Sequence, residues 1–325
     1  MAFGQLTAQF YPIGEDPSLR GMSSYNGKEV ILFEASPTVR FSFANTMVDP
    51  GRNENYRKAY YLATRPQFRM YTDDSSPVKT PSYRVFMGTQ QMFRMPDWER
   101  SEREARFLSF SLESGHYSNG QSGCAFSKQF QDETDECDNV YTTINPDTNL
   151  SDLLNRETGN FSTNLTELIL DYRTYRLTEE EVPKKMHAFQ LGYVLYHNRF
   201  LFLADFGGFS DNDIEIYGRH RWLFAYELMD FWRWKQRKDF RFSFKQTVEI
   251  IATPHEYVNP FRFESMAAVY PIPQTPAFGF MISYIYGHDN YNYRFIDSGH
   301  QVSVGVTWSQ FPPFPLTGAI GKIRR

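Results

Sequence analysis

A histidine and a serine stand two residues apart at the end of one alternating run, in "LESGHYSNGQSG" (Leu112–Gly123). Serine is a weak nucleophile until a neighbouring base removes its proton, and histidine is the side chain that most often does so. The imidazole in turn needs a third group that holds its tautomer and orientation. His116 and Ser118 are therefore candidates for nucleophilic catalysis, provided that a third polar group lies beside them.

The alternation puts this pair on an apolar face. In "LSFSLESGHYS" (Leu108–Ser118) the even positions begin Leu, Phe, Leu and the odd positions begin Ser, Ser, Glu. Successive side chains of a strand point to opposite faces, so His116 and Ser118 continue the apolar row. Polar groups on such a face are costly unless they form hydrogen bonds, which favours a functional reason for their presence.

A third polar residue fits the same face of the next strand. In "STNLTELILDY" (Ser162–Tyr172) Asn164 shares its face with Leu168 and Leu170. Side chains directly opposite one another on paired strands lie within reach of each other. We therefore expect Asn164 to meet His116 on one apolar wall.

Period-two alternation is the dominant pattern of the chain from about Lys28 to Phe311, and turn residues follow each run. We expect strands at residues 28–34, 38–47, 57–72, 82–93, 105–118, 162–176, 217–234, 238–251, 260–270, 277–287 and 298–310. The stretch 186–209 supplies either one strand or a hairpin. Bacterial barrels have an even number of strands, so we predict one strand there and about twelve in all.

The strands have the character of a membrane barrel. Many runs are long enough to cross a bilayer at a tilt, their ends are rich in aromatic residues, and one connection is far longer than the rest. We predict an all-β, antiparallel transmembrane β-barrel with a long extracellular insertion. Residues 1–27 would be an N-terminal extension, and residues 28–325 one barrel domain with a surface insertion at 119–161. With both termini periplasmic, the loops that hold Ser75 and Gly120 share the outer rim.

Composition excludes other classes. Aromatic residues make up 17% of the chain although the mean hydropathy is -0.53, and no apolar run is long enough for a membrane-crossing helix. The net charge of -4, from 34 basic and 38 acidic residues, argues against a nucleic-acid partner. The start, "MAFGQLTAQFYP" (Met1–Pro12), lacks a signal peptide, which we expect to have been removed. Cys124 and Cys137 either form a disulfide or remain two thiols.

These residues resemble the outer-membrane phospholipase A family. "GHYSNGQS" (Gly115–Ser122) is similar to the family's catalytic His, intervening residue, nucleophilic Ser and Asn-Gly. "SSPVKTPSYRVFMG" (Ser75–Gly88) is similar to the loop and strand that precede the site. "YIYGHDNYNYRFIDSGHQVSVGV" (Tyr284–Val306) is similar to the last hairpin. The resemblance covers roughly Thr64 to Phe311 and is closest in these three stretches.

The resemblance implies a twelve-stranded barrel of the bacterial outer membrane that needs Ca²⁺ and hydrolyses acyl ester bonds of phospholipids. Ser118 would attack the acyl carbonyl, and His116 would act as base and then as acid. Asn164 would orient His116, and the backbone amide of Gly120 would stabilise the oxyanion. The active form would be a homodimer.

The resemblance also implies calcium ligands. Ser75 matches the serine given by the neighbouring subunit, Gln121 matches the position that gives a backbone carbonyl, and Asn160 stands where the family has a second serine. This chain departs from the family in having forty-five residues between Ser118 and Asn164. Asn160 has the same strand parity as Asn164 and is the alternative third member of the catalytic group.

Two other functions fit a barrel of this kind. A passive channel would use the inward row of Glu113, Glu167, Asp171 and Arg173, although charges in a small barrel more often pair than line a pore. A surface adhesin or structural barrel would make the long insertion the functional part. Neither function explains three polar residues on an apolar outer face.

Overall fold

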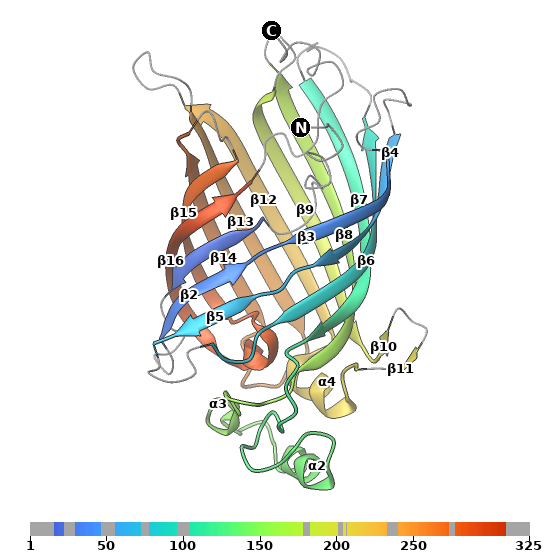
Figure 1. The fold of residues 1–325 in the computed structure, drawn as a ribbon, viewed down its shortest axis with the longest axis vertical. Helices are drawn as coiled ribbons and strands as arrows, with labels where there is room; N and C mark the ends of the chain where they lie inside the picture. The colour runs from blue at the N-terminus through green and yellow to red at the C-terminus, as the bar shows by residue number, and fades with distance from the viewer. Residues whose placement is uncertain are drawn as a thin grey trace.

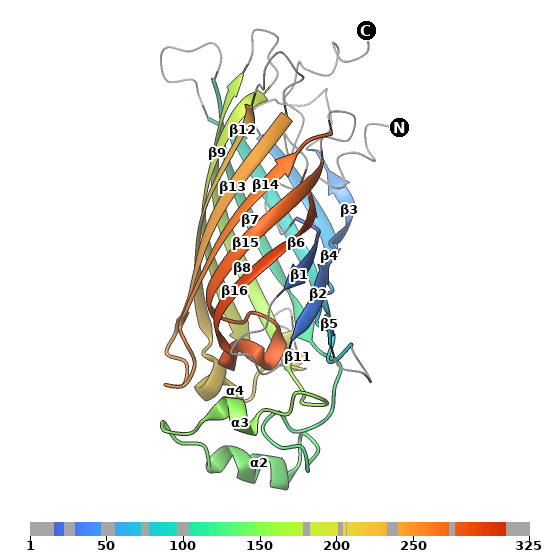
Figure 2. The same ribbon diagram turned by 90° about the vertical axis from the view of Figure 1, so that its left-hand side faces the viewer.

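Fourteen strands form one antiparallel sheet in the computed structural model, which describes residues 16–22, 30–46, 56–72, 78–95, 104–177, 183–200, 204–205, 207–232, 240–272 and 277–309. The strands are β1 (Ser18–Met22), β2 (Ile31–Ser36), β3 (Val39–Asn45), β4 (Tyr56–Thr64), β5 (Phe68–Tyr71), β6 (Tyr83–Arg94), β7 (Glu104–Ser118), β8 (Ser162–Leu177), β9 (Pro183–His197), β12 (His220–Trp232), β13 (Phe240–Ala252), β14 (Phe261–Tyr270), β15 (Phe278–His288) and β16 (Ser298–Trp308). The sheet wraps into a barrel (Figures 1 and 2).

The fourteen strands make twelve wall segments. β2 runs into β3 and β4 runs into β5, and β2 pairs with β5 while β3 pairs with β4. Each of these two consecutive pairs is therefore one wall strand with a bend. β1 pairs with β16 on one side and with β2 on the other, which joins the end of the sheet to its beginning. The barrel class and the expected count of about twelve strands are confirmed.

The start of the barrel differs from the expectation. The strands expected at 28–34 and 38–47 are two parts of one wall strand, β2 with β3. The first wall strand is β1, which lies in the segment 1–27 that we expected to be an extension. Its five residues, "SLRGM", are too few to show an alternating pattern, so no strand could be predicted there. The stretch 186–209 supplies one wall strand, β9, as expected.

A short hairpin follows β9 outside the wall. β10 (Arg199–Phe200) pairs with β11 (Ala204–Asp205) in a separate sheet. β10 lies beside β7 and β8. The hairpin therefore folds back toward the two strands that carry the candidate catalytic residues.

The distribution of side chains is the reverse of that in a soluble barrel. Leu112 and Leu170 are each 40% exposed on the outside, whereas Glu113 is 2% exposed and points inward. Inside, Arg65 pairs with Glu113 at 2.7 Å, and Arg173 pairs with its neighbour Asp171 at 2.6 Å. A polar lumen and an apolar outer band are what a membrane-spanning barrel requires.

Helices cover one end of the barrel, which we call the helical end. They are α2 (Asp135–Thr142), α3 (Leu150–Leu153), α4 (Asp211–Tyr217) and the 3-10 helix η1 (Asn292–Ile296) (Figures 1 and 2). None of the helices in the described residues is long and apolar enough to cross a membrane. The side chains of Phe126, Phe161, Tyr217 and Phe295 pack together beneath these helices.

A disulfide closes the insertion 119–161 on itself, and contacts with Asp297 fix it to the helical end. Cys124 and Cys137 form a disulfide within it. Arg156 binds the carboxylate of Asp297, next to η1, with nitrogen–oxygen distances of 2.5 and 2.7 Å, and Ser151 donates to the same carboxylate at 3.1 Å. The insertion is therefore a folded cap on the barrel wall, which differs from a solvated loop.

Asp213 in α4 gives the helical end a pH dependence. Burial raises the pKa of the Asp213 carboxyl to about 6, against hydrogen bonds from Ser210 that lower it, and the charge of Asp132 raises it further. The folded form thus holds a proton more tightly than the unfolded chain, where the value is near 3.8. The free energy of unfolding therefore falls as the pH rises from about 4 to about 6.

We expect Asp213→Asn to remove this fall, since an amide does not ionise. Thermal unfolding of the detergent-solubilised protein across this pH range measures it, and Asp211→Asn at the exposed start of the same helix is the control. An unchanged dependence on pH in Asp213→Asn would contradict the assignment.

Candidate active site

A hydrogen bond joins His116 to Asn164. The distance from His116 Nδ1 to Asn164 Oδ1 is 3.0 Å. An amide oxygen only accepts, so Nδ1 carries the proton and Nε2 is left as the basic nitrogen. Asn164 has no exposed surface, and His116 is half-buried. This is the geometry of a base held by a neutral orienting group.

The register of β7 and β8 makes this contact. His116 is directly opposite Asn164, and Ser118 is directly opposite Ser162. Two fully antiparallel strands of about fifteen residues hold that register, because a slip by one residue would turn every apolar side chain of the outer row inward. Asn160, the alternative partner, precedes the strand and does not contact His116 in this way.

Ser118 follows His116 on the same face and is half-buried. Within the described part of the chain, no hydrogen bond links its hydroxyl to His116. Catalytic hydrogen bonds are often long in an enzyme without substrate and shorten in the complex. The structure thus joins His116 to Asn164 and has Ser118, the candidate nucleophile, two residues further along the same face.

The turn after Ser118 is held by Asn119, a residue that the sequence did not single out. Its buried side chain donates to the Gly159 carbonyl at 2.7 Å and accepts from the Gln121 amide at 3.2 Å and the Phe161 amide at 3.0 Å. Gly120 is exposed and has a φ of +67°, where a glycine is not strained. Because Asn119 occupies the Gln121 amide, the Gly120 amide is the candidate oxyanion donor of this turn.

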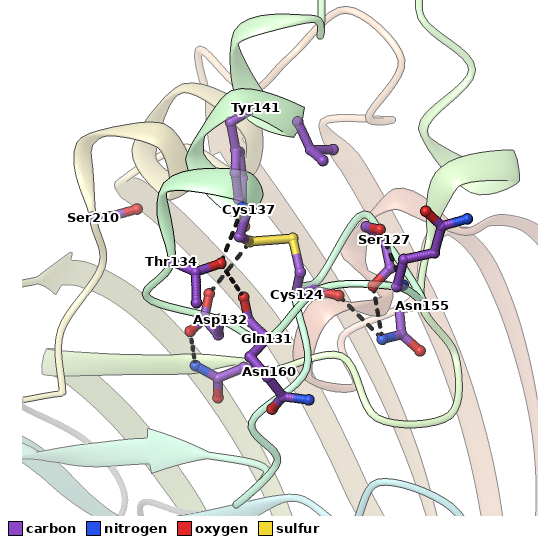
Figure 3. The surroundings of a disulfide bond; sticks show 12 residues. Cys124, Ser127, Gln131, Asp132, Thr134, Cys137, Tyr141, Asn155, Asn160 and Ser210 are labelled. Atoms are coloured by element: carbon purple, nitrogen blue, oxygen red, sulfur yellow. Dashed lines mark hydrogen bonds between the residues drawn. A yellow bond between two sulfur atoms is a disulfide. The ribbon is translucent and has the colours of Figure 1, made fainter.

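The structure describes two of the three candidate calcium ligands, Gln121 and Asn160. Ser75 is outside the described residues. Gln121 is half-buried in the turn, and Asn160 donates from Nδ2 to Asp132 Oδ2 at 2.5 Å (Figure 3). The Asp132 amide bonds the Ser122 carbonyl at 2.8 Å, which holds this carboxylate beside the turn.

The donor chemistry of these residues fits calcium. An amide oxygen, a carboxylate and a backbone carbonyl are all hard oxygen ligands. In the described ranges, no group of three His, Cys, Asp or Glu residues stands ready as a metal centre. Asp132 was missed as an individual residue, since only the acidic run "QDETDE" around it was visible in the sequence.

A second polar row lies next to the first on the outer face. Ser114 and Thr166 are linked through their hydroxyls at 3.0 Å, and Thr166 Oγ1 is 3.0 Å from His197 Nε2. His197 Nδ1 accepts from the Arg199 amide at 3.2 Å, and His197 is directly opposite Asn164 on β9. In the sequence, this row could be recognised only from the outward-facing positions that its residues occupy along their strands.

The fold defines an outer-membrane-type β-barrel with a polar group of residues on its outer wall. No protein-family model matches the chain, and no curated protein matches it. Among solved structures, the chain is similar to outer membrane phospholipase A from Escherichia coli, with 11% identity, 95% of this chain and 98% of that chain covered, and a TM-score of 0.51. The fold expected from the family resemblance is therefore confirmed.

Two further structures share the architecture more loosely. The outer membrane phospholipase dimer of Salmonella typhi with bound calcium has 11% identity, 95% and 98% coverage, and a TM-score of 0.48. The translocator domain of the autotransporter NalP from Neisseria meningitidis has 9% identity, 95% and 93% coverage, and a TM-score of 0.35.

Asn119→Ala tests the support of the turn. The substitution leaves two amide groups and one carbonyl without their buried partner, so we expect a loss of unfolding free energy on the order of 3 kcal/mol. Urea unfolding in detergent measures it. Ser122→Ala removes an exposed hydroxyl that bonds only Gln131 among the described residues, and should change little. A similar small change in Asn119→Ala would contradict this role.

Proposed function

We propose that this protein is an outer-membrane phospholipase that hydrolyses acyl ester bonds with Ser118, His116 and Asn164. The observation that carries the proposal is the 3.0 Å hydrogen bond from His116 Nδ1 to Asn164 Oδ1, made on the outward face of the wall and two residues before Ser118. A membrane barrel has no packing need for a histidine and a buried amide on that face, where lipid favours apolar side chains.

The reaction follows from the positions of these groups. Ser118 Oγ attacks the acyl carbonyl and gives its proton to His116 Nε2, while Asn164 Oδ1 holds the Nδ1 proton of the imidazolium. The Gly120 amide donates to the oxyanion. When the ester C–O bond breaks, His116 returns the proton to the leaving alcohol oxygen. A water molecule, deprotonated by His116, then releases the fatty acid from Ser118.

The surroundings of Ser118 favour a lipid substrate. On β6, Tyr83 is directly opposite Ser118 and Val85 is directly opposite His116. Both side chains point outward, with exposures of 41% and 52%, and Met87 continues the row at 49%. An acyl chain can lie along this apolar row with its ester at the polar end. The substrate class that fits is therefore a phospholipid of the membrane around the barrel.

Calcium is part of the proposal. Asn160 and the carbonyl of Gln121 would hold it, together with Ser75 of the partner subunit in a homodimer, as the family resemblance implies. Asp132 would add a carboxylate, because its Oδ2 lies 2.5 Å from the Asn160 amide nitrogen. When bound, the ion supplies positive charge next to the turn that carries Gly120.

The contents of the lumen count against the channel alternative. Arg65 is 2.7 Å from Glu113 and 3.7 Å from Glu167, and Arg69 binds both Glu34 and Asp289. Arg69 and Glu34 pair across neighbouring strands, whereas the Arg65–Glu113 and Arg69–Asp289 pairs join segments that are far apart in the chain. A cavity of about 220 Å³ remains between them. Paired charges stabilise the interior of a small barrel. A channel would also give the polar residues of the outer face no role.

Ser118→Ala tests the reaction. We expect calcium-dependent release of fatty acid from detergent-dispersed phospholipid by the wild type, and a loss of a factor of about 10³ or more in the variant. Asn164→Ala should lose less, about a factor of ten to a hundred, since the base remains and only its orientation is lost. Equal release by the wild type and Ser118→Ala, with both barrels folded, would contradict the proposal.

Asp132→Asn tests the calcium assignment without relying on turnover. We expect it to weaken the binding of Tb³⁺, followed by sensitised luminescence, and of Ca²⁺ in competition with it, by roughly tenfold, because one ligand charge is removed. Asp147→Asn, an exposed position in the same insertion, is the matched control and should bind as the wild type does. Equal affinity of the two variants would exclude Asp132 as a ligand.

A further inference from the structure

A glycine from a distant loop lies against the ring of His116. A Cβ atom placed on Gly207 would be 2.8 Å from His116 Cε1 and 3.4 Å from His116 Nδ1. The first of these distances is shorter than real Cβ contacts in proteins, so the backbone at Gly207 lies close to the Cε1 edge of the imidazole. Gly207 also has a φ of +57°, which a residue with a side chain rarely adopts.

The same glycine is tied to the strand beside the candidate nucleophile. Ser162 Oγ donates to the Gly207 carbonyl at 2.7 Å, and Ser162 is directly opposite Ser118. Gly207 thus contacts both strands of the site, β7 through His116 and β8 through Ser162. The Ser162 hydroxyl, opposite the candidate nucleophile, therefore holds Gly207 in this contact.

The chain that follows Gly207 is anchored. Phe209 is 3% exposed and packs edge-on against Phe161 and Tyr196 at ring distances of 5.7 and 5.3 Å. A Cβ atom on Gly208 would be 2.0 Å from the Asn198 Cα, so the segment also presses on the end of β9. We call residues 207–209 the cover segment. Figure 1 shows where it begins, at the β10–β11 hairpin beside α4.

His197 fixes the other end of the hairpin. Its Nδ1 accepts from the Arg199 amide at the start of β10, and its Nε2 is 3.0 Å from Thr166 Oγ1. An imidazole that accepts at Nδ1 donates at Nε2, so one ring joins the hairpin to β8. His197 is 7% exposed. The loop that contains the cover segment is therefore held at one end by His197 and at the other by Phe209. Neither residue takes part in the proposed reaction.

We propose that Gly207 is a positioning residue, whose backbone holds the His116 ring in the orientation in which Nδ1 donates to Asn164 and Nε2 is left to accept the Ser118 proton. This inference rests on the proposed function. An amide orients an imidazole less strongly than a carboxylate does, because it carries no charge. A backbone wall against the ring edge restricts the rotation that such a weak tether leaves, and displacements of about 1 Å can cost a hundredfold in rate.

Gly207→Ala tests the proposal, because its methyl group must displace the His116 ring. We expect kcat for phospholipid to fall by about tenfold or more, while KM changes by less than about twofold, since the substrate-binding row on β6 is untouched. The signal of the His116 ring carbon Cε1 in ¹³C-histidine-labelled protein in detergent should move. His116→Gln identifies that signal.

Gly218→Ala is the matched control. Gly218 also has a positive φ, +68°, and a Cβ atom there would be 2.7 Å from Ile251 Cγ2 and 2.8 Å from the Ala252 carbonyl oxygen, so the substitution adds at least as much strain without touching His116. We expect lower thermal stability with an unmoved His116 signal and a kcat within about twofold of the wild type. Ser162→Ala removes only the tie to the Gly207 carbonyl, and should reproduce part of the effect of Gly207→Ala in a chain without added strain.

The outcomes separate the two proposals. A His116 signal and a kcat that stay as in the wild type in Gly207→Ala and Ser162→Ala would overturn the role of Gly207. Equal movement of the signal in Gly218→Ala would also overturn it, because general strain would then be the cause. If the wild type releases no fatty acid while the signal still moves in Gly207→Ala alone, the phospholipase proposal fails and the contact between Gly207 and His116 stands.

Discussion

The pairing register of β7 with β8 is the constraint on which the site depends. It puts His116 opposite Asn164 and Ser118 opposite Ser162, on the outward side of the wall. The same register sets Glu113 inward, where it is paired with Arg65. A slip by one residue would bury the apolar row in a charged lumen and expose the charges to lipid. The cost of that slip holds the hydrogen bond between His116 and Asn164 in place.

The helical end supplies what two strands alone lack. A strand pair can align a base and its orienting group, but it offers no free amide donors on its face because the ladder uses them. In the proposed mechanism the turn after β7 provides such a donor at Gly120, and Asn119 ties this turn to the residues just before β8. The insertion, closed by the Cys124–Cys137 disulfide, brings Asp132 to Asn160. The wall and the cap thus contribute different parts of one site.

What the sequence could predict here was local and periodic. The parity of "STN" at the start of β8 was enough to favour Asn164, because a strand has only two faces. The short β1 carried too few residues for a period, so the beginning of the barrel was misplaced. Asp132 and Gly207 lie in loops. Backbone hydrogen bonds and tertiary packing determine where loop residues lie, and no periodic sequence pattern predicts their positions. The contacts of Asp132 and Gly207 each join residues that are far apart in the chain. Asp132 and Asn160, for example, are 28 positions apart.

In the proposed mechanism, the histidine–asparagine pair on the outer wall activates Ser118. Labelling with a serine-directed sulfonyl fluoride, followed by peptide mass spectrometry, tests it most directly, since the adduct reports one hydroxyl without any assumption about the substrate. We expect an adduct on Ser118 that disappears in His116→Gln, with the other serines unlabelled. An unlabelled Ser118 in the folded wild type, or equal labelling in His116→Gln, would contradict it.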